Sequence, residues 1–229
     1  MTCNGVTVSI VTAETFRATG VAAFESAVLV RCTGVCGGGR ARALGGARAR
    51  TGSSGATATG AERALDASEP TSVAEFNRLD AAHHLVELLV HAGRAASVHT
   101  YTAGNRHRYD IHRVIAAADT EEALRQAWQL GYGALCGQPG VPRSARQLRH
   151  ALRLAAAAWR AALLVTGPTR SDSPGFRVPD LDTATALVRA GRMLDLPVRM
   201  GTRPGGQLLL VLPAGAPRQR LAELTDAAA

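Results

Sequence analysis

The sequence contains no lysine and few aromatic side chains. All 26 basic residues of the 229-residue chain are arginines, and Phe, Trp and Tyr together make up 4% of it. Because arginine occurs here alongside much alanine and glycine, its use in place of lysine is typical of GC-rich coding and says little about bidentate recognition. Alanine carries much of the 46% hydrophobic content, so we expect a core of small and aliphatic side chains.

Acidic residues are also in short supply. Asp and Glu number 18 against 26 arginines, which gives a formal net charge of +8 at pH 7 and a pI near 10.5. Such an excess of positive charge favours an acidic partner, of which nucleic acid is the commonest. The alternative is a basic but otherwise ordinary soluble protein.

Long apolar runs are absent from the sequence. No run approaches the roughly 18 apolar residues that cross a bilayer, and no basic residue precedes Arg17. We therefore expect no membrane partner, no secretory signal and a location in the cytoplasm, with association with the nucleoid as an option. The C-x-x-x-C spacing of Cys32 and Cys36 differs from that of a zinc knuckle, which predicts reduced thiols and no metal site.

No catalytic signature stands out. The seven histidines include no H-E-x-x-H pair, and the stretch GGGRAR lacks the pattern of a phosphate-binding loop. Residues 34–65 are built mainly from Gly, Ala, Arg, Ser and Thr, which predicts a disordered insertion. From this pattern we expect no catalytic residues, no cofactor and no small-molecule substrate.

One short phrase occurs twice, as LVHAGR at Leu89–Arg94 and as LVRAGR at Leu187–Arg192. Each copy lies at the end of an amphipathic pattern, over Leu79–Ala92 and Leu181–Leu194, and each is followed by a strand–turn–strand pattern. Ala-rich apolar segments that end near a glycine precede both copies. The sequence therefore predicts one unit used twice, in the order helix, extended segment, helix, hairpin.

This order resembles the LAGLIDADG homing-endonuclease fold. The stretch AAWRAALLVTGPTRSDSPGFRVPDLDTATALVRAGRMLDLPVRM is similar to the second half of the LAGLIDADG-like domain of WhiA, a bacterial sporulation and cell-division regulator, and AGNRHRYDIHRV resembles a hairpin of that family. The resemblance covers about Ser72–Pro213. It implies an α+β class: a duplicated α-β-β-α-β-β fold with pseudo-twofold symmetry and two antiparallel sheets packed with helices.

On this assignment the chain divides into a first repeat over residues 1–130, a linker over 131–145 and a second repeat over 146–229. The two central helices of the fold pack side by side at the pseudo-symmetry axis, and the alanines of both Ala-rich segments suit a close approach of backbones. WhiA proteins continue into a helix-turn-helix domain, for which too few residues follow Pro213. We therefore expect the LAGLIDADG-like part without that domain.

The resemblance also bears on catalysis. Active LAGLIDADG enzymes end each central helix with an acidic residue that binds a divalent metal. Here the helix ends read RCTGVCGG and VTGPTRSD, with Arg170 near the expected position and Asp172 further on. We therefore predict that the chain is not an enzyme.

Two groups of arginines are candidates for nucleic-acid contact. Arg146, Arg149 and Arg153, with Arg160 further along, fall on one side of a predicted helix, although a solvated face is the alternative. The hairpins place basic side chains where LAGLIDADG proteins saddle DNA, with Tyr101 and Tyr109 interleaved in the first hairpin; the alternative is edge charge that prevents aggregation. The hairpin candidates are Arg106, Arg108, Arg113, Arg199 and Arg203.

These observations lead to a functional hypothesis. We predict a WhiA-like, catalytically inactive protein of transcription regulation, linked to sporulation or cell division, that binds DNA weakly or contacts a protein of the transcription machinery. The alternative is a protein-interaction module, a decayed or split regulator that does not bind nucleic acid.

Overall fold

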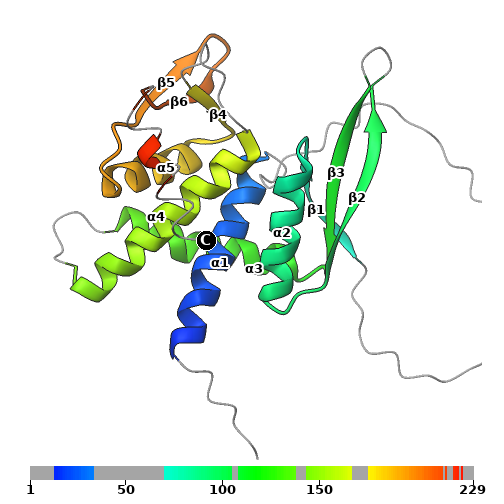
Figure 1. Ribbon diagram of the computed structural model, residues 1–229, viewed down its shortest axis with the longest axis horizontal. Coiled ribbons are helices and arrows are strands. Elements are labelled where there is room, and N and C mark those ends of the chain that lie inside the picture. Colours follow the sequence, from blue (N-terminus) through cyan, green and yellow to red (C-terminus); the bar gives the residue numbers. More distant parts are fainter. Residues whose placement is uncertain are drawn as a thin grey trace, which may run out of the picture.

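The computed structural model describes residues 13–33, 70–104, 108–137, 143–166, 175–213, 215, 219–221 and 223, with side chains from Gly20 onward. The predicted 34–65 insertion lies outside the described residues. Figure 1 shows the arrangement of the helices and strands. In chain order they are α1 (Ala13–Cys32), β1 (Thr71–Phe76), α2 (Leu79–His91), β2 (Ala96–Ala103), β3 (Tyr109–Ala116), α3 (Thr120–Cys136), α4 (Ala145–Thr166), β4 (Gly175–Val178), α5 (Leu181–Met193), β5 (Arg199–Arg203) and β6 (Gln207–Val211).

The strands form two three-stranded antiparallel sheets, one in each half of the chain. The first has the order β1-β3-β2 and the second the order β4-β6-β5, so the last strand of each hairpin is central. The series α1-β1-α2-β2-β3 and α4-β4-α5-β5-β6 repeat one order of elements. This confirms the predicted α+β class, with a duplicated unit and two antiparallel sheets packed with helices.

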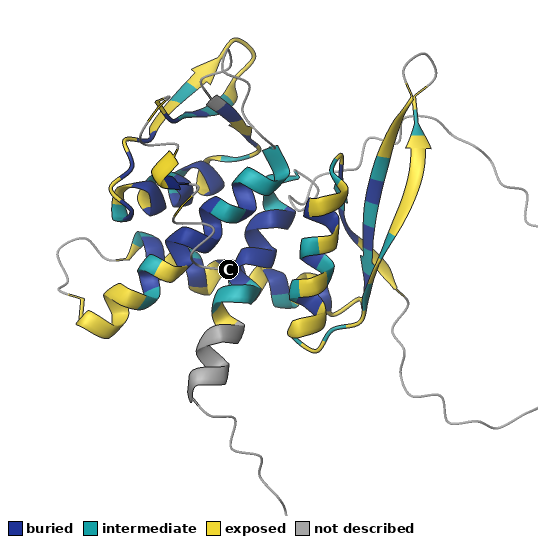
Figure 2. Cartoon of the chain, in the orientation of Figure 1, coloured by how far each residue is buried: buried dark blue, intermediate teal, exposed yellow. Residues whose placement is uncertain are grey.

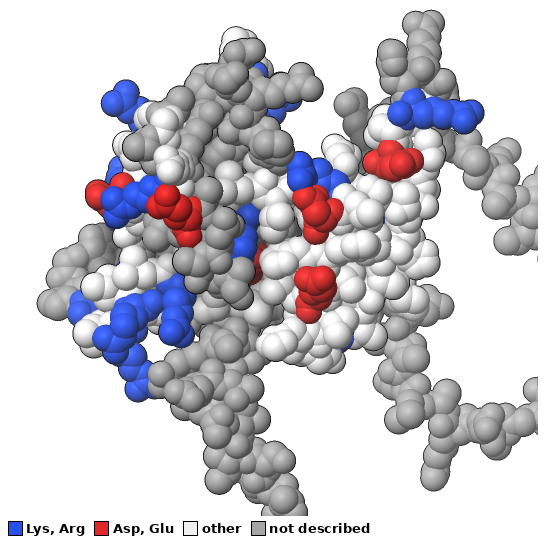
Figure 3. Space-filling model, viewed as in Figure 1, with Lys and Arg blue, Asp and Glu red and all other residues white. Residues whose placement is uncertain are grey.

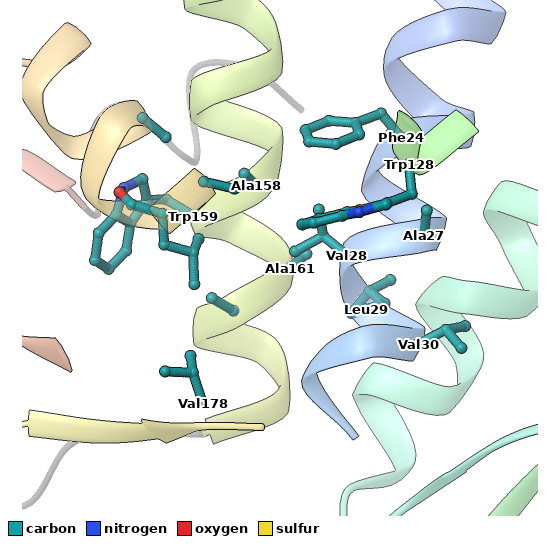
Figure 4. Packing of buried hydrophobic residues seen from close by; sticks show 14 of the residues in the cluster. Phe24, Ala27, Val28, Leu29, Val30, Trp128, Ala158, Trp159, Ala161 and Val178 are labelled. Carbon is teal, nitrogen blue, oxygen red and sulfur yellow. The ribbon is translucent and has the colours of Figure 1, made fainter. Parts of the chain in front are cut away.

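Helices α1 and α4 lie side by side in the middle of the molecule, and the sheets lie on either flank (Figure 1). Alanine makes their close approach possible: Ala158 and Ala161 of α4 are fully buried, and Ala161 lies next to Val28 of α1 (Figure 4). Ala27 of α1 is also buried. The prediction that small residues line this helix pair is confirmed.

A single hydrophobic core joins the two repeats. The buried cluster takes residues from each of the helices α1 to α5 and from both sheets. In Figure 2 the buried residues gather where α1 and the C-terminal half of α4 lie side by side. On the α1 side, Phe24 stacks on Trp128 with ring centroids 5.8 Å apart. On the α4 side, Trp159 meets Phe176 edge-on and donates its indole N–H to the Leu187 carbonyl at 3.1 Å.

The repeated phrase lies at the C-terminal end of a helix in both copies, but the helix ends within the first copy and one residue after the second. Helix α2 ends at His91, and Gly93 follows it with a φ of +77°. Helix α5 continues through Gly191 to Met193. Gly191 packs against Val198, where the Cβ atom of any other residue would collide. The predicted start of α5 is confirmed, since the Asp180 carboxylate accepts a hydrogen bond from the Thr183 N–H at 2.7 Å.

Helix α3 is an element that the sequence analysis did not single out. It begins at Thr120 and ends at Cys136, and so covers part of the predicted linker over residues 131–145. The division into repeats 1–130 and 146–229 stays a prediction. Within the described residues, no helix is both long enough and apolar enough to cross a membrane.

Candidate nucleic-acid interface

The outer face of the β4-β6-β5 sheet carries three arginines. Side chains alternate between the faces of a strand, and directly paired residues point to the same side. Phe176, Leu210 and Met200 are aligned across the sheet on the side that holds the buried residues. The opposite face therefore carries Arg177, Arg199 and Arg203, all of which are exposed.

These three side chains form one basic surface. Arg177 pairs with Leu209 of β6, which pairs on its other side with Gly201, so Arg177 lies across the sheet from the midpoint between Arg199 and Arg203. Strands β4, β5 and β6 contain no acidic residue. None of the three arginines forms an ion pair with another residue that the structure describes. We refer to Arg177, Arg199 and Arg203 as the sheet-B arginines.

The first sheet is different, because its central arginine is paired. Arg113 of β3 donates to the Glu75 carboxylate of β1 from Nε at 2.8 Å and to the Tyr101 hydroxyl of β2 at 3.2 Å. Its guanidinium also lies 4.9 Å from the centre of the Tyr101 ring. The hydrogen bond with Glu75, which outweighs the cost of burial, raises the pKa of Arg113 above its ordinary value. Arg113 thus ties three strands together, which the sequence could not show because Glu75 is distant along the chain.

The tip of the first hairpin is only partly described. Arg108 is exposed just before β3, whereas Arg106 lies outside the described residues. The hairpin extends beyond the helices in Figure 1. By strand alternation Arg108 lies on the same face as Asp110 and His112, and Arg113 lies on the other face. Arg108 and Arg113 therefore do not share one surface of the hairpin.

The candidate arginines of helix α4 lie apart from both sheets. Arg146, Arg149 and Arg153 are exposed on the N-terminal half of α4, and Figure 3 shows a gathering of basic side chains over this part of the molecule. Arg160, further along α4, is largely buried and is paired with a carboxylate. Its Nε donates to Glu25 Oε1 of α1 at 2.6 Å, so the predicted stripe of four arginines ends before it.

Glu25 is the centre of a buried ionic network. Its side chain is 2% exposed and accepts hydrogen bonds from Arg160 of α4 and from His84 Nε2 of α2, the latter at 2.9 Å. Burial alone raises the pKa of Glu25, but the hydrogen bonds and charges of Arg160 and His84 outweigh it and hold that pKa below its ordinary value of 4.5. The network joins α1, α2 and α4.

Sequence reasoning missed two features of these sites. Arg177 was not named, although the alternation in the short segment GFRV places it opposite the buried Phe176 and Val178. The network around Glu25 had no sequence signal, because its members come from three separate helices. Among the described residues there is no group of three or more His, Cys, Asp or Glu placed to hold a metal ion.

Comparison with known proteins gives one structural neighbour. The crystal structure of I-DmoI in complex with DNA and Mn superposes with a TM-score of 0.49 and 7% sequence identity, over 90% of this chain and 97% of that one. A likeness at this level concerns the arrangement of elements and nothing further. No family model matches the chain, and no curated protein matches it.

The prediction that the chain is not an enzyme is corrected by this comparison. I-DmoI, the neighbour found, is a homing endonuclease, and nothing in the comparison indicates that the present chain is inactive. The absence of an acid at the two central helix ends was the basis of that prediction. The positions on which it depended, including Arg170 and Asp172, lie outside the described residues.

Proposed function

We propose that the chain binds DNA through the outer face of its β4-β6-β5 sheet. The observation that carries this proposal is that arginines are the only ionisable side chains of these three strands, and that all three arginines point to the exposed face. Phosphate oxygens are the natural partners of such a surface, because arginine N–H groups neutralise and orient them. The net charge of +8 adds long-range attraction.

The dimensions of the surface suit a phosphate backbone. Arg199 and Arg203 lie four residues apart on β5, which corresponds to about 13 Å along a strand. One strand of duplex DNA carries a phosphate about every 3.4 Å along the helix axis. The sheet-B arginines can therefore contact more than one phosphate at once. Arg108, at the tip of the other hairpin, is a further candidate.

The finer hypothesis is a regulatory role. A WhiA-like function in transcription, sporulation or cell division, in the cytoplasm or at the nucleoid, rests on the sequence resemblance over Ser72–Pro213. The sheet-B arginines would supply contacts to the DNA backbone, which position a protein on the duplex but do not read its sequence. A protein of the transcription machinery is the second partner that this hypothesis includes.

The test is duplex binding across a salt series. Binding of the purified chain to random duplex DNA is measured by fluorescence anisotropy between about 50 and 200 mM salt, where phosphate contacts show as a steep decline in affinity. We expect the double substitution R199A/R203A to flatten the log–log slope by about 0.9 for each phosphate that the variant no longer neutralises.

The matched control is R192A, which removes one exposed arginine from the last turn of α5. We expect it to leave the slope nearly unchanged, since Arg192 is not on the sheet. Equal losses of affinity in the control and the double variant, or no binding at the lowest salt, would refute the proposal.

A further inference from the structure

Residues of helices α1, α3 and α4 line a groove. None of the described lining residues belongs to a strand of either sheet. The three helices are labelled in Figure 1. The volume of the groove is about 840 Å³, and its lining is mainly apolar. Ala23 of α1, Ala127 and Leu130 of α3 and Leu154 of α4 are among the lining residues. Leu130 is 77% exposed, so a large apolar side chain faces solvent at the edge of this groove.

One wall of the groove is strongly basic. Arg146, Arg149 and Arg153 line it from α4, and their spacing places them along about 10 Å of that helix. No carboxylate lines the groove in the described part of the chain. The nearest acid along α3 is Glu122, which directly precedes the lining residue Ala123. Its carboxylate accepts a hydrogen bond from Gln126 at 2.9 Å and is paired with Arg125. The groove thus combines an apolar floor with three arginines that form no ion pair with another described residue.

We propose that this groove binds an acidic amphipathic helix of a partner protein. An apolar floor of this size accepts the leucine-like face of a helix, as grooves between helices do. The row of arginines on one wall then meets acidic side chains that flank that face, which supplies orientation and selectivity. The proposal does not depend on DNA binding, because it uses none of the sheet-B arginines.

Other occupants fit these features less well. A nucleic-acid strand would engage the arginines but leave the apolar floor exposed, and none of the described lining residues is an aromatic on which a base could stack. A second copy of this chain brings a net charge of +8 against the arginines. The N-terminal twelve residues, MTCNGVTVSIVT, contain no carboxylate. An acidic helix is the occupant that matches both the floor and the wall.

The experiment uses a designed probe and the full chain. The probe is a fluorescein-labelled synthetic helix of about 18 residues, or five turns, with leucine on one face and glutamate on its flanks. The control peptide has lysine in place of every glutamate. We expect the glutamate peptide to bind with a salt-dependent anisotropy change and the lysine peptide not to bind.

Variants of the chain locate the binding. All substituted side chains are exposed, and circular dichroism checks that the fold is retained. R149E/R153E is expected to weaken binding of the glutamate peptide about tenfold or more, and L130Q is expected to weaken it several-fold by making the groove edge polar. R203E, on the distant sheet, is the matched control and should leave peptide binding unchanged.

Two outcomes would overturn the proposal. Equal binding of both peptides, or unchanged binding to R149E/R153E, would show that the groove does not select an acidic helix. A decrease of duplex DNA binding in R149E/R153E as large as that in R199A/R203A, with no peptide binding, would assign the α4 arginines to nucleic acid. The salt series with duplex DNA and R199A/R203A tests the proposed DNA binding separately, so a failure of the groove proposal and a failure of the proposed function can be told apart.

Discussion

Small differences in side-chain volume decide how the helices of this protein approach one another. Gly131 of α3 lies directly beneath the ring of Phe24, and a Cβ atom at this position would lie 2.0 Å from its Cδ2 atom. Phe24 is fully buried and stacked on Trp128, so it has no free space into which to move. Two residues later, Gly133 has nothing within 4 Å of an added Cβ atom.

This pair of glycines gives a prediction at the scale of the residue. Gly131→Ala should lower the free energy of unfolding by about 1–3 kcal/mol, because overpacking in a filled core costs this much. Gly133→Ala in the same helix should raise it by about 0.5–1 kcal/mol, because alanine loses less conformational entropy in a helix. Urea denaturation of both variants checks the pair, and a destabilised Gly133→Ala would contradict this explanation.

The thiol of Cys32 differs from free cysteine in its pKa. Burial raises the pKa of Cys32, at the end of α1, to about 12, and the Asp180 carboxylate adds to the effect. Since the thiolate is the reactive form, we expect this thiol to react more slowly than free cysteine near neutral pH.

At the scale of the element, the helices are joined by polar contacts as well as apolar ones. The Glu25 carboxylate binds α1 to α4 through Arg160 and to α2 through His84. Arg31 links α1 to α5, where it contacts Asp180 at 3.3 Å and Thr183. These contacts fix the relative placement of helices whose alanine faces alone would allow sliding.

The Glu25 network makes stability depend on pH. A carboxyl whose pKa is lowered on folding stabilises the protein fully above its ordinary pKa of 4.5, and this contribution disappears as pH falls through the lowered value. We expect the free energy of unfolding, measured by urea from about pH 7 to about pH 3, to fall through this acidic range. Glu25→Gln should be less stable by about 3 kcal/mol at neutral pH, because it leaves Arg160 without its carboxylate.

The control for this experiment is Glu87→Gln. Glu87 lies on α2 near His84, but its side chain is 77% exposed, so we expect its removal to change neither the neutral stability nor the acid dependence appreciably. If the Glu25→Gln variant kept the acid dependence of the wild type, other carboxyl groups would have to cause it.

At the scale of the whole molecule, the two repeats share one core. Helices α1 and α4 contribute to it from opposite halves of the chain, and α3 packs on both α1 and α5. The buried cluster is continuous between the two halves. We therefore expect that neither repeat folds independently of the other.

This shared core predicts one cooperative unfolding transition. In a Trp128→Phe variant, Trp159 of the second repeat becomes the only tryptophan, and its fluorescence reports that half. We expect its thermal transition to coincide with loss of helix measured by far-ultraviolet circular dichroism, as two-state unfolding requires. Two separated transitions would show that the repeats unfold independently.

The local elements and the duplication could be predicted without the structure. Amphipathic periodicity placed α2 and α5 to within a residue of their observed ends, and alternation with glycine turns placed both hairpins, because these signals depend only on near neighbours along the chain. The excess of positive charge is likewise a property of composition. The close pair of central helices is what the resemblance to the LAGLIDADG fold implies, and the alanine-rich segments are compatible with it.

The arginines that are available to a partner could not be told from the sequence and follow from the packing of the chain. Arg113 and Arg160 are held by Glu75 and Glu25, which are distant in sequence, whereas Arg177, Arg199 and Arg203 meet on an exposed face with no acid on their strands. The groove beside α3 arises where three helices meet and has no counterpart in any single stretch of sequence. Net charge is a sum over all residues, and hydrophobic periodicity depends on near neighbours along the chain, so both can be obtained from the sequence. Ion pairs between distant residues depend on how the helices and strands pack. Packing therefore determines which arginines face solvent and which are paired with carboxylates.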